Sequence, residues 1–322
     1  MDEALRAEIE AVSRGDFEHG VRKQASLPEG GIALGLAGTA PAVLLEHDGR
    51  VAVALPGPPS ELRRLWERVV EHEAVQRILA EGRPPGRRLL RLFGPSESAV
   101  ARVLAEAGGE DDGVEITVCA RDLEIVVELV VPEGSAPVAE ALEQSLRTTF
   151  GRELFAVDDE RSVAELVLEY ARGVGLRVAT AESCTGGLVG ARLTDVPGSS
   201  DVYVGGIVAY SDEVKQSALG VSDDTLRAHG AVSAETAAAM AGGVRTRLGA
   251  DLGIAVTGVA GPGGGTREKP VGLVYIHVEG SQGEVTWNGR LPGDREAVRI
   301  RATAMALHLV RRLLAQSRDE PA

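Results

Sequence analysis

The feature of the sequence that most constrains the fold is a regular alternation of strand and helix patterns that begins near residue 156. Several of the strand segments are apolar on both faces, and helical segments separate them. Strands that are buried on both faces need helices on both sides of the sheet. The pattern predicts that residues 156–322 form a layered α/β domain with a covered sheet, whose strands include "LRVAT", "VYVGGIVAY", "LGIAVTG" and "VGLVYIHV".

Two shorter segments precede this domain. Residues 88–155 follow the order strand, helix, strand, strand, helix, which predicts a small α+β module. Residues 1–87 contain the hairpin pattern "AVLLEHDGRVAVALPG" followed by a helical pattern, which is typical of the second half of an α/β domain. The composition changes between the two segments at "AEGRPPGRR". We therefore expect an α/β protein made of three parts.

Composition and charge restrict the partners of the chain. Of the 322 residues, 44% are apolar but only 3% are aromatic, so the core must consist of Val, Leu, Ile and Ala. The 34 basic and 48 acidic residues give a formal charge of -14, which repels a phosphate backbone over most of the surface. We therefore expect no nucleic-acid partner, although a few N–H groups and one arginine can still hold a small anion.

Cysteine content and hydropathy indicate the compartment. The chain has two cysteines, Cys119 and Cys184, which are far apart in sequence and form no disulfide framework. The most apolar stretch, "LEIVVELVV", is too short to span a bilayer. The expectation is a cytoplasmic protein with no membrane partner.

The segment "TAESCTGG" joins a predicted strand to a predicted helix. It offers two candidate nucleophiles, Ser183 and Cys184. It also places the N–H groups of Thr185, Gly186 and Gly187 at the start of a helix, where the positive end of the helix dipole attracts anions. The turn is therefore a candidate site for a phosphate or an oxyanion, and the sequence leaves open which of the two it holds.

Two more loops follow predicted strands of the same domain. In "AYSDEVK" a strand ends near Tyr210 and a helix begins with Ser211 or Asp212 as its cap, so Lys215 lies in the first helical turn. The positive end of the dipole disfavours the ammonium form there, so Lys215 is a candidate neutral base. In "AVTGVAGPGGGTREKPVG" the glycines allow a close approach of the backbone to a ligand. In an open α/β sheet these loops share one crevice at the carboxyl ends of the strands.

Each of these residues also has an ordinary structural interpretation. Ser183 is in a position where serine often caps a helix, and Cys184 can be a small buried apolar residue. Lys215 alone can be a solvated helix residue, and Tyr210 a core or interface aromatic. The glycine-rich stretch can be a flexible turn. The convergence of three loops at strand ends is what favours a functional site.

The motifs of this domain closely resemble the CinA C-terminal family of nicotinamide-mononucleotide amidohydrolases over residues 156–316. The resemblance rests on "AESCTGGLVGARLTDVPGSSDVYVGGIVAYSDEVKQSALGV", "HGAVSAET", "AVTGVAGPGGGTREKPVG" and "PGDREAVR". It implies that the domain hydrolyses the carboxamide of nicotinamide mononucleotide (NMN) to nicotinate mononucleotide and ammonia, a step of pyridine nucleotide salvage. A nucleotide-binding scaffold without catalysis is the alternative.

The hypothesis assigns a role to each matching residue. Ser183 is the nucleophile, and Lys215, with Tyr210 nearby, handles the proton. No group with zinc-ligand spacing occurs in this domain, and the amidase is expected to need no metal or other cofactor. The substrate-binding residues are expected to be Glu182, Thr185, Gly186, Gly187, Thr257, Gly261, Gly264, Gly265, Thr266 and Arg295, with Arg295 contacting the phosphate.

The resemblance extends upstream of the amidohydrolase motifs. "RKQASLPEG", "GTAP" and "LPGPPSEL" resemble the second half of the molybdopterin-binding-like domain of CinA proteins, and residues 88–155 resemble their KH-type domain. The family's acidic "GGLGPT-x-DD" loop does not occur in this sequence. The expectation is therefore that the divalent-metal site and the ADP-ribose pyrophosphatase activity of that domain are absent. Unpaired strand edges in residues 1–87 and the small-residue helix "AETAAAMAGGV" favour a homodimer or a higher homo-oligomer.

Overall fold

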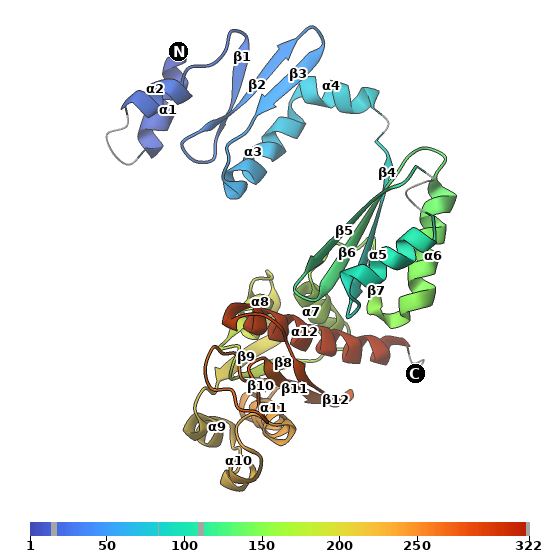
Figure 1. Cartoon of the computed structure of the whole chain (residues 1–322). Helices are drawn as coiled ribbons and strands as arrows, with labels where there is room; N and C mark the ends of the chain where they lie inside the picture. Colours follow the sequence, from blue (N-terminus) through green and yellow to red (C-terminus); the bar gives the residue numbers. More distant parts are fainter. Residues whose placement is uncertain (14–17, 83, 109–112, 320–322) are drawn as a thin grey trace. The chain divides into compact units, whose positions relative to one another are not determined.

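The computed structural model describes residues 1–13, 18–82, 84–108 and 113–319 of the chain (Figure 1). The chain divides into two compact units, Met1–Pro85 and Gly86–Ala322. Both units combine helices with sheets, and the mixed α/β class predicted from the sequence is confirmed. Within the described part of the chain, no helix is both long and apolar enough to cross a membrane.

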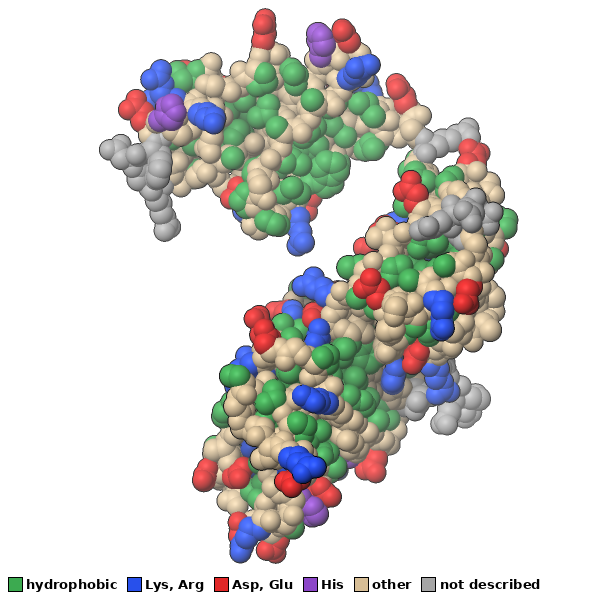
Figure 2. Space-filling view, viewed as in Figure 1, with side chains coloured by type: hydrophobic (Ala, Val, Ile, Leu, Met, Phe, Trp, Pro, Cys, Tyr) green, Lys and Arg blue, Asp and Glu red, His purple; other side chains and the backbone are tan. Residues whose placement is uncertain are grey.

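The first unit is built on a three-stranded antiparallel sheet with the order β1-β2-β3. The predicted hairpin is confirmed, with His47 paired to Arg50 beside the turn. Leu65 and Val69 of the third helix are buried against this sheet. Figure 2 shows hydrophobic side chains gathered on the visible face of the unit, and Trp66 is 50% exposed. The elements are α1 (Glu3–Val12), α2 (Glu18–Gln24), β1 (Gly31–Leu36), β2 (Pro41–His47), β3 (Arg50–Ala54), α3 (Pro59–Glu71) and α4 (Glu73–Glu81).

The second unit begins with a four-stranded antiparallel sheet in the order β5-β6-β4-β7. Two helices pack on it through a core that includes Val100, Leu142 and Leu146. The predicted order of elements is observed, and the additional strand β7, which crosses the predicted end of the module at residue 155, completes the sheet. The structure divides the chain only at Pro85, so the boundary near residue 155 stays a prediction. The elements are β4 (Gly86–Phe93), α5 (Glu97–Glu106), β5 (Glu115–Arg121), β6 (Glu124–Val131), α6 (Ala136–Phe150) and β7 (Leu154–Val157).

The second sheet of this unit has the order β12-β11-β10-β8-β9. Its three strands β10, β8 and β9 are parallel, whereas β11 and β12 are antiparallel to their neighbours. The carboxyl ends of the three parallel strands therefore lie at one edge, where the predicted loops follow them. The strands are β8 (Val178–Glu182), β9 (Tyr203–Val208), β10 (Leu252–Gly258), β11 (Leu273–Gly280) and β12 (Gly283–Arg290).

Helices cover both faces of this sheet, which confirms the predicted layered arrangement (Figure 1). One core joins the sheet to α7 (Val163–Gly173), α8 (Leu188–Thr194) and α12 (Arg295–Asp319). The other core joins it to α9 (Asp212–Leu219), α10 (Asp223–His229) and α11 (Ala234–Leu248). Helix α10 was not predicted, although Ser222 is a regular cap that accepts a hydrogen bond from the N–H of Thr225.

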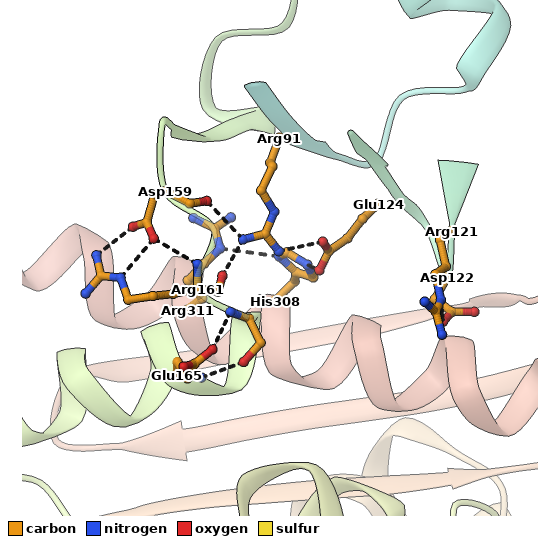
Figure 3. A network of polar contacts seen from close by, with 10 residues as sticks. Arg91, Arg121, Asp122, Glu124, Asp159, Arg161, Glu165, His308 and Arg311 are labelled. Carbon is orange, nitrogen blue, oxygen red and sulfur yellow. Dashed lines mark hydrogen bonds and ion pairs between the residues drawn. The ribbon is translucent and has the colours of Figure 1, made fainter. Parts of the chain in front are cut away.

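A buried polar network joins the four-stranded sheet to α12 (Figure 3). Glu124 accepts hydrogen bonds from Arg91 Nη2 and His308 Nε2, each at 2.8 Å. The His308 ring stacks on Phe93 with 3.7 Å between ring centroids. Burial lowers the pKa of His308 to about 4, so the ring is neutral at pH 7, with its proton on Nε2. Hydrogen bonds and ring stacking therefore hold the two halves of the unit together.

Helix α11 packs so closely that one of its positions admits only glycine. A Cβ atom at Gly243 would lie 2.0 Å from the carbonyl oxygen of Leu219. We expect Gly243→Ala to lower the free energy of unfolding by about 1–3 kcal/mol because backbone would have to move. Gly173→Ala, at a helix position with nothing within 4 Å, is the matched control and should change it by less than about 0.5 kcal/mol. Urea unfolding measures both, and equal effects would contradict the close approach.

Candidate active site

Two loops of the predicted site begin side by side because the strands before them are in register. Glu182, the last residue of β8, pairs with Val208 on one side and Val256 on the other. The N–H of Ser183 donates to the carbonyl of Val256 at 2.9 Å, and the N–H of Ala209 donates to that of Glu182 at 2.8 Å. The structure thus brings the Ser183 turn next to the loop that contains Tyr210.

The side chain of Glu182 is enclosed at the start of α8. It is 1% exposed, and its carboxylate accepts hydrogen bonds from the N–H groups of Gly187, Val189 and Gly190 at 2.8–3.0 Å. In this structure the carboxylate is buried and bonded to backbone N–H groups, and the expectation that Glu182 binds substrate stays a prediction. Its position is that of an internal anion at the positive end of the helix.

The N–H groups of the two glycines, which the sequence analysis assigned to an anion, form hydrogen bonds within the protein in this structure. The N–H of Gly187 donates to Glu182, and that of Gly186 donates to the carbonyl of Ser183 at 3.1 Å. The glycines serve the backbone conformation. Gly186 and Gly187 have φ values of +61° and +96°, in the left-handed region that side chains other than glycine rarely adopt.

The two candidate nucleophiles differ in chemistry as well as in position. Ser183 is 8% exposed and Cys184 is 5% exposed. Burial raises the pKa of the Cys184 thiol to about 12, so almost no thiolate is present at neutral pH. Cys184 belongs to the hydrophobic core that also contains Val189 and Leu193. The packed-residue interpretation of Cys184 is therefore favoured, which leaves Ser183 as the candidate nucleophile.

Lys215 is one of the largest fully buried side chains of the protein, with 1% exposure. It lies in the first turn of α9, which Ser211 caps by accepting a hydrogen bond from the N–H of Val214. Its Nζ lies 3.5 Å from the Tyr210 carbonyl oxygen and 3.6 Å from Asp212 Oδ1. The Lys215 side chain is thus inside the protein at the sheet edge where Ser183 lies, whereas Tyr210 is 61% exposed.

The glycine-rich loop after β10 folds back on itself. Thr257 is 1% exposed, and its hydroxyl donates to the carbonyl of Ala231 at 2.7 Å, so it holds a neighbouring loop. Its predicted contact with substrate stays a prediction. Thr266 Oγ1 accepts from the N–H of Lys269 at 3.0 Å, which closes a turn. Gly261 is buried and Gly264 and Gly265 are exposed. A cleft of about 560 Å³ lies between this loop and α12, lined by Pro262, Val271 and Arg295 among others.

The first two turns of α12 contact all three loops. Arg295 donates from Nη1 to the carbonyl of Gly261 at 2.8 Å and from Nη2 to the Tyr210 hydroxyl at 2.7 Å. Arg299, one turn later, donates from Nη2 to the carbonyl of Thr185 at 2.8 Å. The sequence prediction named Arg295 but missed Arg299. The i, i+4 spacing of the two arginines in "PGDREAVR" places both on one helix face and was the signal that could have found it.

One polar atom of the Ser183 turn has no partner. Thr185 is fully buried, and its Oγ1 makes no hydrogen bond within the part of the chain that the structure describes. In that same part, the N–H of Thr185 donates to no backbone carbonyl, unlike the N–H groups of Ser183 and Gly186. A buried hydroxyl without a partner in a water-poor turn is suited to donate to a charge that forms during a reaction.

Comparison with known proteins identifies the family. Residues 160–314 match the CinA C-terminal domain. A CinA-like protein of Mycolicibacterium paratuberculosis strain ATCC BAA-968 / K-10 is 45% identical over 301 residues, covering 91% of this chain and 68% of the relative. The chain belongs to the CinA family.

Other CinA proteins match over similar or shorter parts. A CinA-like protein of Mycobacterium tuberculosis strain ATCC 25177 / H37Ra is 44% identical over 298 residues. The crystal structure of a competence/damage inducible protein from Agrobacterium tumefaciens is 41% identical, covers 47% of this chain and 94% of that one, and superposes with a TM-score of 0.45. The match to the CinA C-terminal domain and the identity to the CinA-like proteins confirm the resemblance to CinA proteins that the sequence motifs indicated.

The Glu182 carboxylate should contribute more to stability than an exposed helix cap. Glu182→Gln replaces one acceptor oxygen with a donor that faces backbone N–H groups, and we expect it to lower the free energy of unfolding by about 3 kcal/mol. The matched control is Glu165→Gln, because Glu165 accepts one N–H, from Ser162, in a partly exposed capping box. We expect the control to cost about 1 kcal/mol or less. Urea titration measures both, and equal losses would argue against the buried cap.

The elevated pKa of Cys184 predicts selective alkylation. At pH 8, iodoacetamide should label the exposed Cys119 in the folded protein and leave Cys184 unmodified. Both should be labelled in urea, which serves as the control. Peptide mass spectrometry measures the two sites separately. Comparable labelling rates in the folded protein would show that Cys184 is an accessible, reactive thiol.

Proposed function

We propose that residues 156–316 catalyse the hydrolysis of the carboxamide of NMN, giving nicotinate mononucleotide and ammonia. The observation that carries the proposal is the convergence of a serine, a buried lysine and two arginines at the carboxyl edge of one sheet. A nucleophile, a group that can take its proton and cations for a phosphate are the parts that an amidase acting on a nucleotide requires. The choice of NMN follows from the resemblance of the motifs to nicotinamide-mononucleotide amidohydrolases.

In the proposed reaction, Ser183 Oγ attacks the carboxamide carbon while neutral Lys215 Nζ accepts the hydroxyl proton. The tetrahedral intermediate collapses, the C–N bond breaks, and ammonia leaves with the proton that Lys215 returns. Water then hydrolyses the ester on Ser183 and releases the carboxylate. Side chains and water account for every proton, so the proposed step uses no cofactor. Tyr210 holds Lys215 through its backbone carbonyl and Arg295 through its hydroxyl.

The backbone hydrogen bonds of the Ser183 turn support separate binding groups for the oxyanion and for the phosphate. The N–H groups of Ser183, Gly186 and Gly187 are already bonded within the protein, which favours Cys184 and Thr185 as the oxyanion donors. Arg299 and Arg295 extend from α12 on the same side and are proposed to bind the nucleotide phosphate, since a guanidinium presents several donors in one plane. One oxyanion donor typically lowers a barrier by about 3 kcal/mol.

Ammonia release from NMN tests the proposal. We expect Ser183→Ala to lower kcat by about 10³-fold or more, because the nucleophile is removed. Cys184→Ala is the matched control, a neighbouring substitution that removes only a packed thiol, and it should keep the rate within about threefold if the protein remains folded. A fully active Ser183→Ala would contradict the serine mechanism. Loss confined to Cys184→Ala would assign the nucleophile to the thiol.

Lys215→Met separates the proton-transfer role from substrate binding. The substitution keeps an unbranched side chain in the buried space, so we expect turnover to be lost while the Kd for NMN changes little. Isothermal titration with NMN measures binding in the same preparation. If the unaltered protein binds NMN without releasing ammonia, the domain is a nucleotide-binding scaffold and the amidase proposal fails.

A further inference from the structure

A second cavity lies in the same unit. It is next to the C-terminal half of α12, whereas the Ser183 turn contacts the N-terminal part of that helix. It has a volume of about 960 Å³ and is bounded by the end of α6, the segment before β7, α7 and the last turns of α12. Arg152, Arg311 and Arg312 line it, together with the single acidic side chain of Glu153. Arg311 lies 12 positions after Arg299, so the helical rise separates the two places by about 18 Å. The cavity is therefore separate from the candidate active site.

Arg311 is buried, and it forms no ion pair with any side chain that the structure describes. It is 5% exposed, its Nε donates to His308 Nδ1 at 3.3 Å, and its guanidinium lies over the Phe155 ring at 4.7 Å. Its Nη2 is buried and has no acceptor among the residues that the structure describes. Burial lowers the pKa of Arg311 to about 10, so the group is still protonated at neutral pH. A water molecule can satisfy one N–H but leaves the buried charge unbalanced.

The groups next to Arg311 do not neutralise its positive charge. Arg312 Nε is also buried without an acceptor in the described structure, while its Nη2 donates to the carbonyl of Phe93 at 3.3 Å. The carboxylate of Glu124, which could have balanced Arg311, is already bonded to Arg91 and to neutral His308 (Figure 3). Among the side chains that the structure describes, three arginines and one glutamate line the cavity and give it a net positive charge, in a chain whose formal charge is -14.

We infer that this cavity is a binding site for a small phosphate-bearing anion, held by Arg311 and Arg312 and closed on its exposed side by Arg152. Guanidinium groups bind phosphate through paired N–H donors, and Arg311 and Arg312 both line the cavity. The cavity is large enough for free phosphate or for a phosphate carried on a nucleotide. Both sources present the same group to the arginines.

Hydrogen–deuterium exchange locates the site without relying on enzyme activity. At constant ionic strength, inorganic phosphate should slow exchange in peptides covering residues 149–155 and 308–315. AMP should do so at lower concentration if the natural ligand is a nucleotide and at a similar concentration if it is free phosphate, and adenosine should have no effect. Protection that is confined to residues 183–187 and 295–299, or protection by adenosine alone, would overturn the inference.

Substitution of the cavity arginines supplies the second test. Arg152 is exposed, so Arg152→Ala should fold normally and weaken phosphate binding about fivefold or more, measured by isothermal titration in the Arg299→Gln background to reduce active-site binding. Arg102→Ala, at an exposed arginine of α5, is the matched control and should bind as before. Arg311→Met should abolish binding if it folds. Equal affinities of the Arg152→Ala and Arg102→Ala proteins would contradict the site.

Discussion

The three hydrogen bonds from the start of α8 to the buried Glu182 carboxylate determine the geometry of the site. A carboxylate that is 1% exposed needs a compensating positive field, and here the N–H groups and dipole of α8 supply it instead of a cation. The same residue ends β8 and pairs with both neighbouring strands. The turn that follows, with Ser183 as its first residue, is therefore fixed relative to the sheet.

Helix α12 makes the other contacts that position the loops of the candidate site. Its first turns contact the loops through Arg295 and Arg299, while its later turns carry His308 and Arg311 into the network with the four-stranded sheet. A single helix of 25 residues thus contacts both the candidate active site and the second cavity. Because a helix is a stiff connection, the position of its N-terminal arginines depends on the packing of its C-terminal half.

Much of the layered fold could be predicted from the sequence because it depends on local patterns. The apolar strands, the caps at Ser211 and Ser233, and the hairpin at residues 47–50 each have a signal within a few neighbours. Helix α10 has only seven residues and no long apolar period, so it was missed despite its cap at Ser222. The four-stranded sheet gains β7 through pairing with β4, a partner about 60 residues away that no local pattern reveals.

The sequence could predict which loops form the candidate site but not which hydrogen bonds their residues make. The sequence indicated that the loops with Ser183 and Tyr210 would lie at one edge, because parallel strands end together, and the resemblance to CinA proteins added Arg295. It could not show that Glu182 occupies the N–H groups of α8, since a carboxylate in a motif looks the same whether it faces a ligand or the backbone. Nor could it show that Thr257 bonds Ala231 or that Arg299 reaches Thr185, contacts that join residues 26 and 114 positions apart.

The most direct test of the account is to locate the covalent intermediate. Acid quenching of a reaction with NMN, followed by peptide mass spectrometry, should find a nicotinate mononucleotide ester on the peptide that contains Ser183, and Ser183→Ala should lack it. The ester should form on Ser183 and not on Cys184, whose thiol burial keeps protonated. Ammonia release at the normal rate by Ser183→Ala, or an adduct on Cys184, would contradict the central claim.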